Sequence, residues 1–281
     1  MRFDPNYRSS NIEDRRGARV GLGRGMGLGG TVILLVLSLI FGRNLLDGSG
    51  PAAVPSEQTA PGESAPVQET AEERARVGLV STVLDDAQQV WARVLPQYGT
   101  QYRETKLVLF RDAVQSGCGV AQSAMGPFYC PNDERVYIDL GFYDELRRRF
   151  GAPGDFAQAY VLAHEVGHHV QHLIGTDQRV RQLQERNPRA ANQLSVRLEL
   201  QADCYAGVWA KSTEQRRLLE AGDVQEALGA AASVGDDRIQ SQETGSIQPE
   251  SFTHGSAEQR MQWFRRGFET GSPESCNTFE G

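Results

Sequence analysis

The chain has 281 residues, of which 39% are hydrophobic and 23% are charged. That length accommodates one membrane or targeting element and one globular domain of roughly 200 residues. The formal net charge is −7 and the isoelectric point is about 5.4, which argues against nucleic acid as a partner.

An apolar segment follows a polar N-terminus. Residues 1–25 are rich in glycine and arginine and predict a disordered, cytoplasmic basic arm. Residues 26–46 are mainly apolar, and a stretch of this length can span the roughly 30 Å of a bilayer core, so we expect one transmembrane helix. Because arginines crowd its N-terminal side, the positive-inside rule places the N-terminus in the cytoplasm and the rest of the chain in the periplasm or outside the cell.

The apolar segment has two other interpretations. A cleaved signal peptide would need a small-residue cleavage site, and the best one, Pro51-Ala52-Ala53, contains a proline. A buried soluble helix is disfavoured by the glycine-rich start and the missing amphipathic pattern. Residues 47–72 are rich in Pro, Ser and Glu and predict a disordered linker to a domain of residues 73–281.

Within that domain, the spacing of apolar residues predicts many helices and a small sheet. Helices are expected at residues 73–96, 145–150, 155–174, 189–212, 223–234 and 255–268, and strands at 106–110 and 135–140. Glycines between residues 116 and 131 indicate turns or a hairpin, a polar connector follows residue 175, and residues 235–253 are expected to be a loop. The order of elements indicates an α+β fold.

One helix carries the pentad His164-Glu165-Val166-Gly167-His168 directly after an apolar stretch. Residues four apart lie on one helix face with Cβ atoms about 5–6 Å apart, so both histidines can direct a ring nitrogen at one ion. Imidazole suits zinc, and Glu165 would flank the ion as a base that takes a proton from water and passes it to a leaving amine. The alternative is a helix that carries these residues by chance, but burying them without partners would be costly.

A catalytic zinc site usually has three protein ligands, so a third one is required. His172 lies roughly 12 Å beyond His164 along the helix axis, and His169 points away from the shared face. Asp177 is possible but follows the helix end. The chain lacks the third histidine of a metzincin motif, which excludes that class.

Two carboxylates in a second long helix are better placed. Glu199 and Asp203 are four residues apart and therefore lie on one helix face. We expect Glu199 to be the third zinc ligand and Asp203 to accept a hydrogen bond from the far nitrogen of a ligand histidine. A surface acidic pair is the alternative, and the surrounding alanines and leucines argue against it.

Together these motifs resemble a known family. The pentad followed by Glu199 and Asp203 is similar to the gluzincin class of zinc peptidases, and nearly the whole chain outside the linker resembles the neutral zinc metallopeptidases. The residues that carry this resemblance are Met1-Arg2-Phe3, Arg15-Arg16-Gly17, Gly117-Cys118-Gly119 and the ranges 126–131, 163–171, 199–207 and 252–257. The resemblance implies a zincin-like, membrane-anchored peptidase domain with one Zn²⁺, and it implies no particular substrate.

Residues 253–260 also resemble a Thr-His-Pro-Ser segment found late in some membrane gluzincins, with Gly255 in place of the proline. Peptide hydrolysis builds negative charge on the carbonyl oxygen, and a positioned histidine can stabilise that charge. The resemblance therefore nominates His254 as a second catalytic residue. The alternative is a loop histidine that caps the last helix.

The four cysteines are even in number and contain no Cys-x-x-Cys pair, so a cysteine zinc site is not expected. An exported domain lies in an oxidising compartment, where disulfides form. Three pairings are possible and the sequence does not choose among them. The favoured pairing joins Cys118 to Cys130 across a glycine-rich loop and Cys204 to Cys276.

The resulting prediction is a membrane-anchored, zinc-dependent endopeptidase that acts on peptide or protein substrates. His164, His168 and Glu199 would hold the zinc ion, with Glu165 and His254 as catalytic residues. A catalytically inactive zinc-binding scaffold is one alternative, and a metal-free interaction protein of the cell envelope is the other. The intact Glu165 argues against the scaffold, because a purely structural zinc site does not need it.

Overall fold

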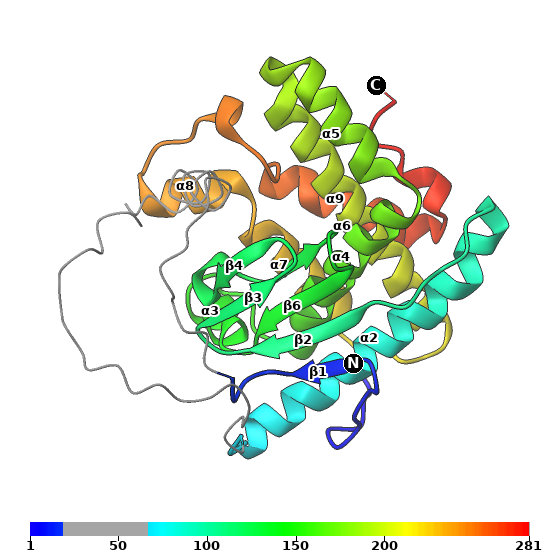
Figure 1. The fold of residues 1–281 in the computed structure, drawn as a ribbon, viewed down its shortest axis with the longest axis vertical. Helices are drawn as coiled ribbons and strands as arrows, with labels where there is room; N and C mark the ends of the chain where they lie inside the picture. Colours follow the sequence, from blue (N-terminus) through cyan, green and yellow to red (C-terminus); the bar gives the residue numbers. More distant parts are fainter. Residues whose placement is uncertain (19–66, 281) are drawn as a thin grey trace.

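A computed structural model describes residues 1–18 and 67–280 of the chain, and Figure 1 shows its fold. The strands are β1 (Ile12–Asp14), β2 (Lys106–Phe110), β3 (Ala113–Ser116), β4 (Gly119–Gln122), β5 (Phe128–Cys130) and β6 (Arg135–Asp139). The helices are α2 (Ala71–Val94), α3 (Phe142–Arg148), α4 (Asp155–Leu173), α5 (Thr176–Arg186), α6 (Ala191–Gln215), α7 (Asp223–Ser233), α8 (Asp236–Glu243) and α9 (Ala257–Thr270). A mainly helical α+β fold with a small sheet is therefore confirmed.

The sheet places one short strand at its edge, close to the central helix. Its strand order is β1-β2-β6-β5, with β1, β2 and β6 parallel and β5 antiparallel to β6. The hairpin β3–β4 forms a separate two-stranded sheet. Because β5 contacts α4, the edge of the sheet lies beside the helix that carries the pentad.

Helix α4 lies in the core, between α2, α6 and α7. Its apolar face is largely buried, and Phe156 stacks on Trp209 of α6 with ring centroids 5.6 Å apart. Helix α9 crosses α6 closely because Gly267 has no side chain. A Cβ atom at Gly267 would lie 1.9 Å from the carbonyl oxygen of Cys204. This close crossing brings residues of α9 toward the pentad.

The N-terminal residues belong to this domain, and the expectation of a disordered basic arm over residues 1–25 is wrong for residues 1–18. Strand β1 pairs with β2 in the register Ile12 to Leu107. The amino group of Met1 lies 2.8 Å from Asp155 and 3.3 Å from Asp223. The polar side chains that look like a solvated arm in the sequence thus have partners in the body of the domain.

This packing also corrects the predicted topology. A strand cannot be hydrogen-bonded into a sheet from the opposite side of a membrane, so a cytoplasmic N-terminus combined with an external domain is wrong for this fold. The expected transmembrane helix, residues 26–46, and most of the 47–72 linker lie outside the described residues. Among residues 1–18 and 67–280, no helix has the length and apolar character needed to cross a bilayer.

The boundary at residue 73 is also too late. Helix α2 begins at Ala71, and the Thr70 side chain accepts a hydrogen bond from the backbone N–H of Glu73 to cap it. Glu69, placed in the linker by the sequence, forms an ion pair with the buried Arg16 at 2.5 Å. Residues 67–72 therefore belong to the folded domain.

Two helices occupy segments that were expected to be irregular. Helix α5 lies in the polar connector, and Val180 is its single buried residue, so its sequence gives little apolar periodicity. Helix α8 lies in the expected loop and is mostly polar. Helix α4 begins at Asp155, as expected, and Gly154 is its N-cap.

Both favoured disulfides are present. Cys118 bonds to Cys130 and thereby joins the β3–β4 hairpin to strand β5. Cys204 bonds to Cys276, so the C-terminal segment is fixed against α6.

Candidate metal centre and active site

The two histidines of the pentad face the same space from α4. The His164 and His168 rings lie 4.7 Å apart between centroids and are perpendicular to each other. Both side chains are largely buried, with 8% and 17% of their surfaces exposed. Their four-residue spacing on a buried helix therefore produces the shared face that the sequence predicts.

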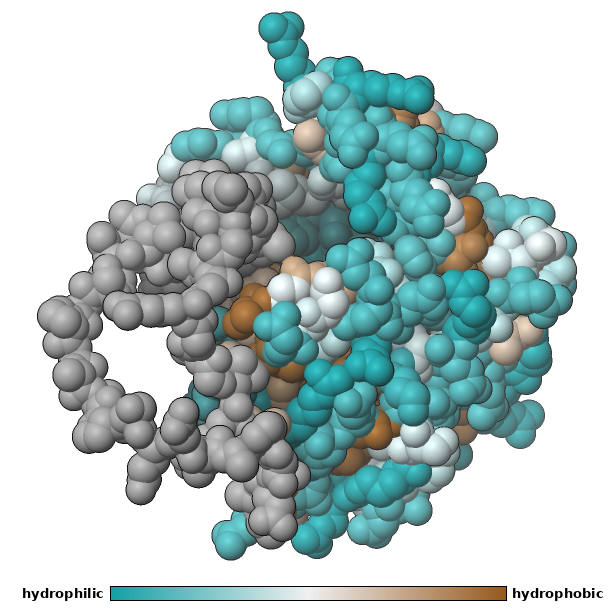
Figure 2. Space-filling view, in the orientation of Figure 1, coloured by the Kyte–Doolittle hydropathy of each residue, from teal (hydrophilic) through white to brown (hydrophobic). Residues whose placement is uncertain are grey.

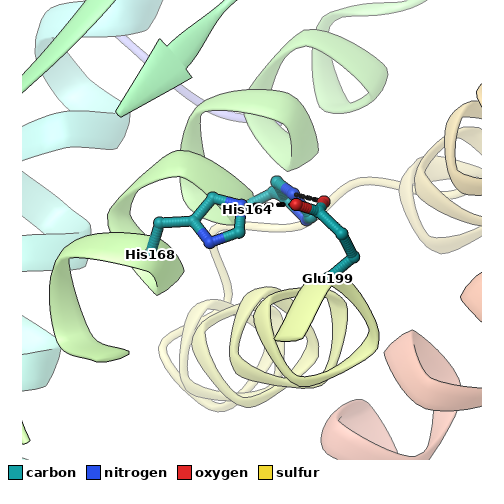
Figure 3. Close-up of side chains that lie close together, drawn as sticks. All are labelled: His164, His168 and Glu199. Carbon is teal, nitrogen blue, oxygen red and sulfur yellow. Dashed lines mark hydrogen bonds and ion pairs between the residues drawn. The ribbon is translucent and has the colours of Figure 1, made fainter. Parts of the chain in front are cut away.

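Helix α6 brings the predicted third ligand to the same point. One carboxylate oxygen of Glu199 lies 3.1 Å from Nε2 of His164, and the other lies 3.5 Å from Nε2 of His168. Figure 3 shows the two imidazoles of α4 facing the Glu199 carboxylate of α6. Two imidazole nitrogens and one carboxylate oxygen form a common donor set for catalytic zinc.

The two helices can approach this closely because the pentad contains a glycine. A Cβ atom at Gly167 would lie 3.1 Å from the backbone oxygen of Ala202 on α6. Most real Cβ contacts are longer, so a larger residue would push α6 away from α4. The three donor atoms of His164, His168 and Glu199 all lie within 4.8 Å of one another. The residues present therefore fit a zinc ion.

A buried hydrogen-bond network orients His164 from behind. Nδ1 of His164 lies 2.8 Å from Oδ1 of Asp203, the residue predicted for this position. The Tyr160 hydroxyl donates to the same oxygen at 2.5 Å, and Nε of Arg260 donates to Oδ2 at 2.8 Å. With Nδ1 bound to the carboxylate, Nε2 is left to face Glu199.

The charges in this network control the ionisation of His164 and Asp203. Burial alone would lower the pKa of the His164 imidazole, but the Asp203 carboxylate, together with the hydrogen bond to Glu199, raises it to about 10. Burial alone would raise the pKa of the Asp203 carboxyl, but Arg260 and His164 keep it below its usual range. Asp203 therefore stays ionised and supports positive charge at the neighbouring ring.

His168 has a different partner for its second nitrogen. The Gln171 side-chain oxygen lies 2.8 Å from Nδ1 of His168. The amide nitrogen of Gln171 in turn donates to the backbone oxygen of Leu198 at 2.7 Å and to the Gln201 side chain at 3.1 Å. Both ligand histidines are thus held by their outer nitrogens, which is the arrangement that fixes the orientation of metal ligands.

Glu165 lines the same cavity without belonging to the ligand set. It is buried, with 7% of its surface exposed, and burial raises the pKa of its carboxyl. A carboxylate in this position can exchange protons with a reactant in the cavity while the two histidines and Glu199 hold an ion.

His254 also lines the cavity, and Asp236 fixes its position. Oδ2 of Asp236 accepts hydrogen bonds from the backbone N–H groups of Thr253 and His254 at 2.7 Å and of Gly255 at 3.1 Å. Oδ1 of Asp236 lies 3.1 Å from Nδ1 of His254. Gly255 has a φ of +94°, which disfavours residues other than glycine and is closed to proline. The backbone at position 255 therefore fits the glycine of this chain and not the proline of the Thr-His-Pro-Ser segment.

The other histidines near the pentad lie outside this centre. His169 is enclosed, with Nε2 donating to the backbone oxygen of Arg103 at 2.6 Å and Nδ1 accepting from the Tyr129 hydroxyl at 2.9 Å. His172 pairs with Asp177 at 2.9 Å. Among the residues that the structure describes, His169, His172 and Asp177 therefore contribute no donor to the His164, His168 and Glu199 group.

The candidate centre opens into a cavity of about 580 Å³. Figure 2 shows the molecule hollowed on this face, with apolar surface along part of the border. Strand β5 contributes Phe128 and Tyr129 to the wall, α3 contributes Phe142, and α5 contributes Asp177 and Arg181. The cavity therefore extends to both sides of the pentad.

The sequence of the whole chain matches a family model described as "Putative neutral zinc metallopeptidase" over residues 1–279.

The chain belongs to this family.

Related proteins carry no experimental assignment in their names. The "Uncharacterized protein YpfJ" of Escherichia coli is 45% identical over 289 residues, and the match covers 99% of each chain. An "Uncharacterized protein" of Mycobacterium bovis is 47% identical over 201 residues, which covers 68% of this chain and 66% of the relative. No solved structure matches the chain. For this zinc metallopeptidase family member, function must therefore be argued from the site itself.

Four residues of the site were missed by the sequence analysis, namely Tyr160, Gln171, Asp236 and Arg260. Tyr160 carries a weak signal, since it lies four residues before His164 on the same helix face. The others come from the end of the pentad helix, from the expected loop and from the last helix, and no local pattern links them to zinc.

The Asp203 network makes a direct prediction for metal affinity. Asp203→Asn should weaken zinc binding by about 10- to 100-fold, because the group that holds Nδ1 of His164 loses its charge. Tyr160→Phe removes one hydrogen bond to Asp203 and keeps the carboxylate, so its effect should be smaller. Competition with a zinc-binding dye measures both affinities in the full-length protein. Equal affinities for the wild type and Asp203→Asn would contradict this role.

Proposed function

We propose that this protein is a zinc-dependent endopeptidase. The observation that carries the proposal is the convergence of His164, His168 and Glu199 on one point of a cavity that Glu165 also lines. A structural zinc site is usually closed by four protein ligands, whereas a catalytic site leaves a position open to the cavity. Zinc held by these three residues would polarise a water molecule and the carbonyl of the scissile peptide bond.

The side chains of the chain itself account for the proton transfers. Glu165 takes the proton from the attacking water and passes it to the amine that leaves. His254, held through Asp236, faces the cavity and stabilises the negative charge that develops on the carbonyl oxygen. Asp203, Arg260 and Gln171 orient the ligand histidines and do not touch the substrate.

The cavity supports a peptide substrate rather than a small molecule. Strand β5 is the edge of the four-stranded sheet in the described part of the chain, and its residues line the cavity. An edge strand can pair with an extended peptide through backbone hydrogen bonds. Since the cavity continues on both sides of the pentad, we infer that the bond cut lies within a chain rather than at its end.

We also propose an oxidising compartment for the domain, at a cell membrane. The two disulfides support this location, because such bonds persist outside the cytosol. The apolar residues 26–46 remain the proposed membrane contact. The pairing of β1 with β2 requires residues 1–18 to share the compartment of the peptidase domain.

Chelation tests the proposed function. The purified full-length protein should contain about one zinc per chain and cleave a mixed peptide library. A chelator such as 1,10-phenanthroline should abolish the cleavage, and added Zn²⁺ should restore it. A zinc-loaded protein that cuts no peptide would contradict the proposal and favour the inactive scaffold, and a protein that binds no zinc would favour the metal-free interaction protein.

A further inference from the structure

The C-terminal segment of the domain lies against the helical turn that carries Glu199. We define this segment as residues 273–279, drawn in red in Figure 1; it follows α9, and its first residues contact α6. The Thr278 hydroxyl donates to the backbone oxygen of Arg197 at 2.6 Å. Nη1 of Arg197 in turn donates to the backbone oxygen of Phe279 at 3.4 Å. These contacts join the segment to α6 two residues before the proposed ligand Glu199.

A second connection runs from this segment to the ligand His168 through two glutamine side chains. Nε2 of Gln201 donates to the backbone oxygen of Cys276 at 3.1 Å, and Nε2 of Gln171 donates to Oε1 of Gln201 at 3.1 Å. Oε1 of Gln171 lies 2.8 Å from Nδ1 of His168. Both glutamine side chains are buried, so these hydrogen bonds are shielded from competing water.

The direction of these hydrogen bonds determines which nitrogen of His168 carries the proton. A backbone oxygen can only accept, so the Cys276 oxygen requires the NH₂ group of Gln201 and leaves the Gln201 oxygen to face Gln171. Gln171 then presents its own NH₂ group to Gln201 and to the backbone oxygen of Leu198, which lies 2.7 Å away. The Gln171 oxygen is left to accept from Nδ1 of His168. Nε2 of His168 therefore keeps the lone pair that a zinc ion needs.

The disulfide between Cys204 and Cys276 keeps the segment in this place. Both cysteines are fully buried. Among the described residues that line the cavity, Gln201, Cys276 and Thr278 do not occur, so a substrate in the cavity would not touch them. An effect of these residues on metal binding must therefore pass through the ligand-bearing helices α4 and α6.

We infer that residues 273–279 are a positioning element of the metal centre. They orient His168 through Gln201, and Thr278 holds the turn of α6 that carries Glu199. The inference rests on the proposed function in taking the bound ion to be zinc, and it does not depend on cleavage. Partners that orient metal ligands contribute about 10- to 100-fold in affinity. Gln201 and Thr278 act one step behind such partners, so each should contribute about 3- to 10-fold.

Point variants of the full-length protein test this role by zinc affinity. Gln201→Met and Thr278→Val should each weaken zinc binding by about 3- to 10-fold, measured by competition with a zinc-binding dye. The matched controls are Gln88→Met, at a buried glutamine of α2, and Thr213→Val, at a buried hydroxyl that donates to Ala210 of α6 at 2.7 Å. The controls should lower the melting temperature without changing the affinity. Affinities of Gln201→Met and Thr278→Val equal to those of the controls would overturn the inference.

A double variant tests the path from Gln201 to His168. Gln171→Met removes the contact to Nδ1 of His168, so Gln201→Met added to it should weaken zinc binding little further. Residues that act in one hydrogen-bonded path give effects that do not add. Losses that add in full would show that Gln201 does not act through Gln171, and would overturn this path.

Hydrogen exchange gives a readout without any metal and separates this inference from the proposed function. In the metal-free protein, the backbone amides of residues 199–203 should exchange at least about 3-fold faster in Thr278→Val than in Thr213→Val. Equal rates would contradict a role of Thr278 in holding this turn. If zinc affinity falls as expected and no peptide is cut, the peptidase proposal fails and the positioning role remains. If peptides are cut and the variants keep their zinc affinity and exchange rates, the positioning role fails and the peptidase remains.

Discussion

Glu165→Gln should remove peptide cleavage and leave the bound zinc in place. The carboxylate lines the cavity but supplies no donor to the ligand group, so an amide of the same shape leaves the metal centre intact. The amide cannot accept and return a proton, and general acid–base catalysis of this kind contributes about 10²- to 10⁴-fold. We therefore expect kcat/KM to fall by about 10³-fold, as measured with a quenched fluorescent peptide.

The matched control for this experiment is Glu145→Gln. Glu145 also lines the cavity, but it lies on α3 and is exposed, away from the ligand group. This variant should keep most of the activity. Chelator-sensitive cleavage that persists in Glu165→Gln would exclude Glu165 as the base. Zinc analysis of each variant shows whether a loss of activity comes from loss of metal.

Removal of residues 1–18 should unfold the domain or prevent it from folding. The deletion takes away β1, exposes the side of β2 that pairs with it, and leaves the carboxylates around Met1 without their cation. The total stability of a domain is only about 5–15 kcal/mol, and this deletion removes contacts to both the sheet and α4. Thermal unfolding followed by circular dichroism should show no cooperative transition near that of the full-length protein.

Point variants distinguish a specific role of this segment from a general effect of truncation. Arg16→Ala removes a guanidinium whose side chain is 1% exposed and paired with Asp14 and Glu69, and it should lower the free energy of unfolding by about 2–3 kcal/mol. Arg8→Ala is the control, because the Arg8 side chain is 40% exposed, and its effect should be below about 0.5 kcal/mol. A truncated chain that melts like the full-length protein would refute the role of residues 1–18.

The centre of the site could be predicted from the sequence because its chemistry lies in short, local patterns. His164, Glu165 and His168 fall on one helical turn, and Glu199 and Asp203 repeat the same spacing on another helix. The periodicity of each helix is enough to place the side chains on common faces. That the two helices meet at one metal site could be inferred only from the family resemblance and from the need of zinc for a third ligand.

The rest of the site depends on contacts that no local pattern reports. Arg260 reaches Asp203 because α9 crosses α6 at Gly267, and Asp236 reaches His254 from a helix whose sequence is too polar to show periodicity. The N-terminal segment was misjudged for a similar reason. Its charges suggest a solvated arm, and their partners, such as Asp223 and Glu69, lie far away in the sequence.

The parallel pairing of β1 with β2 has a consequence for how the protein is made. The sheet cannot be completed until residues near Leu107 have been synthesised, since Ile12 pairs with Leu107 across the long intervening segment. Residues 12–14 therefore have no strand to pair with while the intervening chain is made. Formation of this sheet therefore cannot follow the order of the chain, because β1 waits for a strand that is made much later.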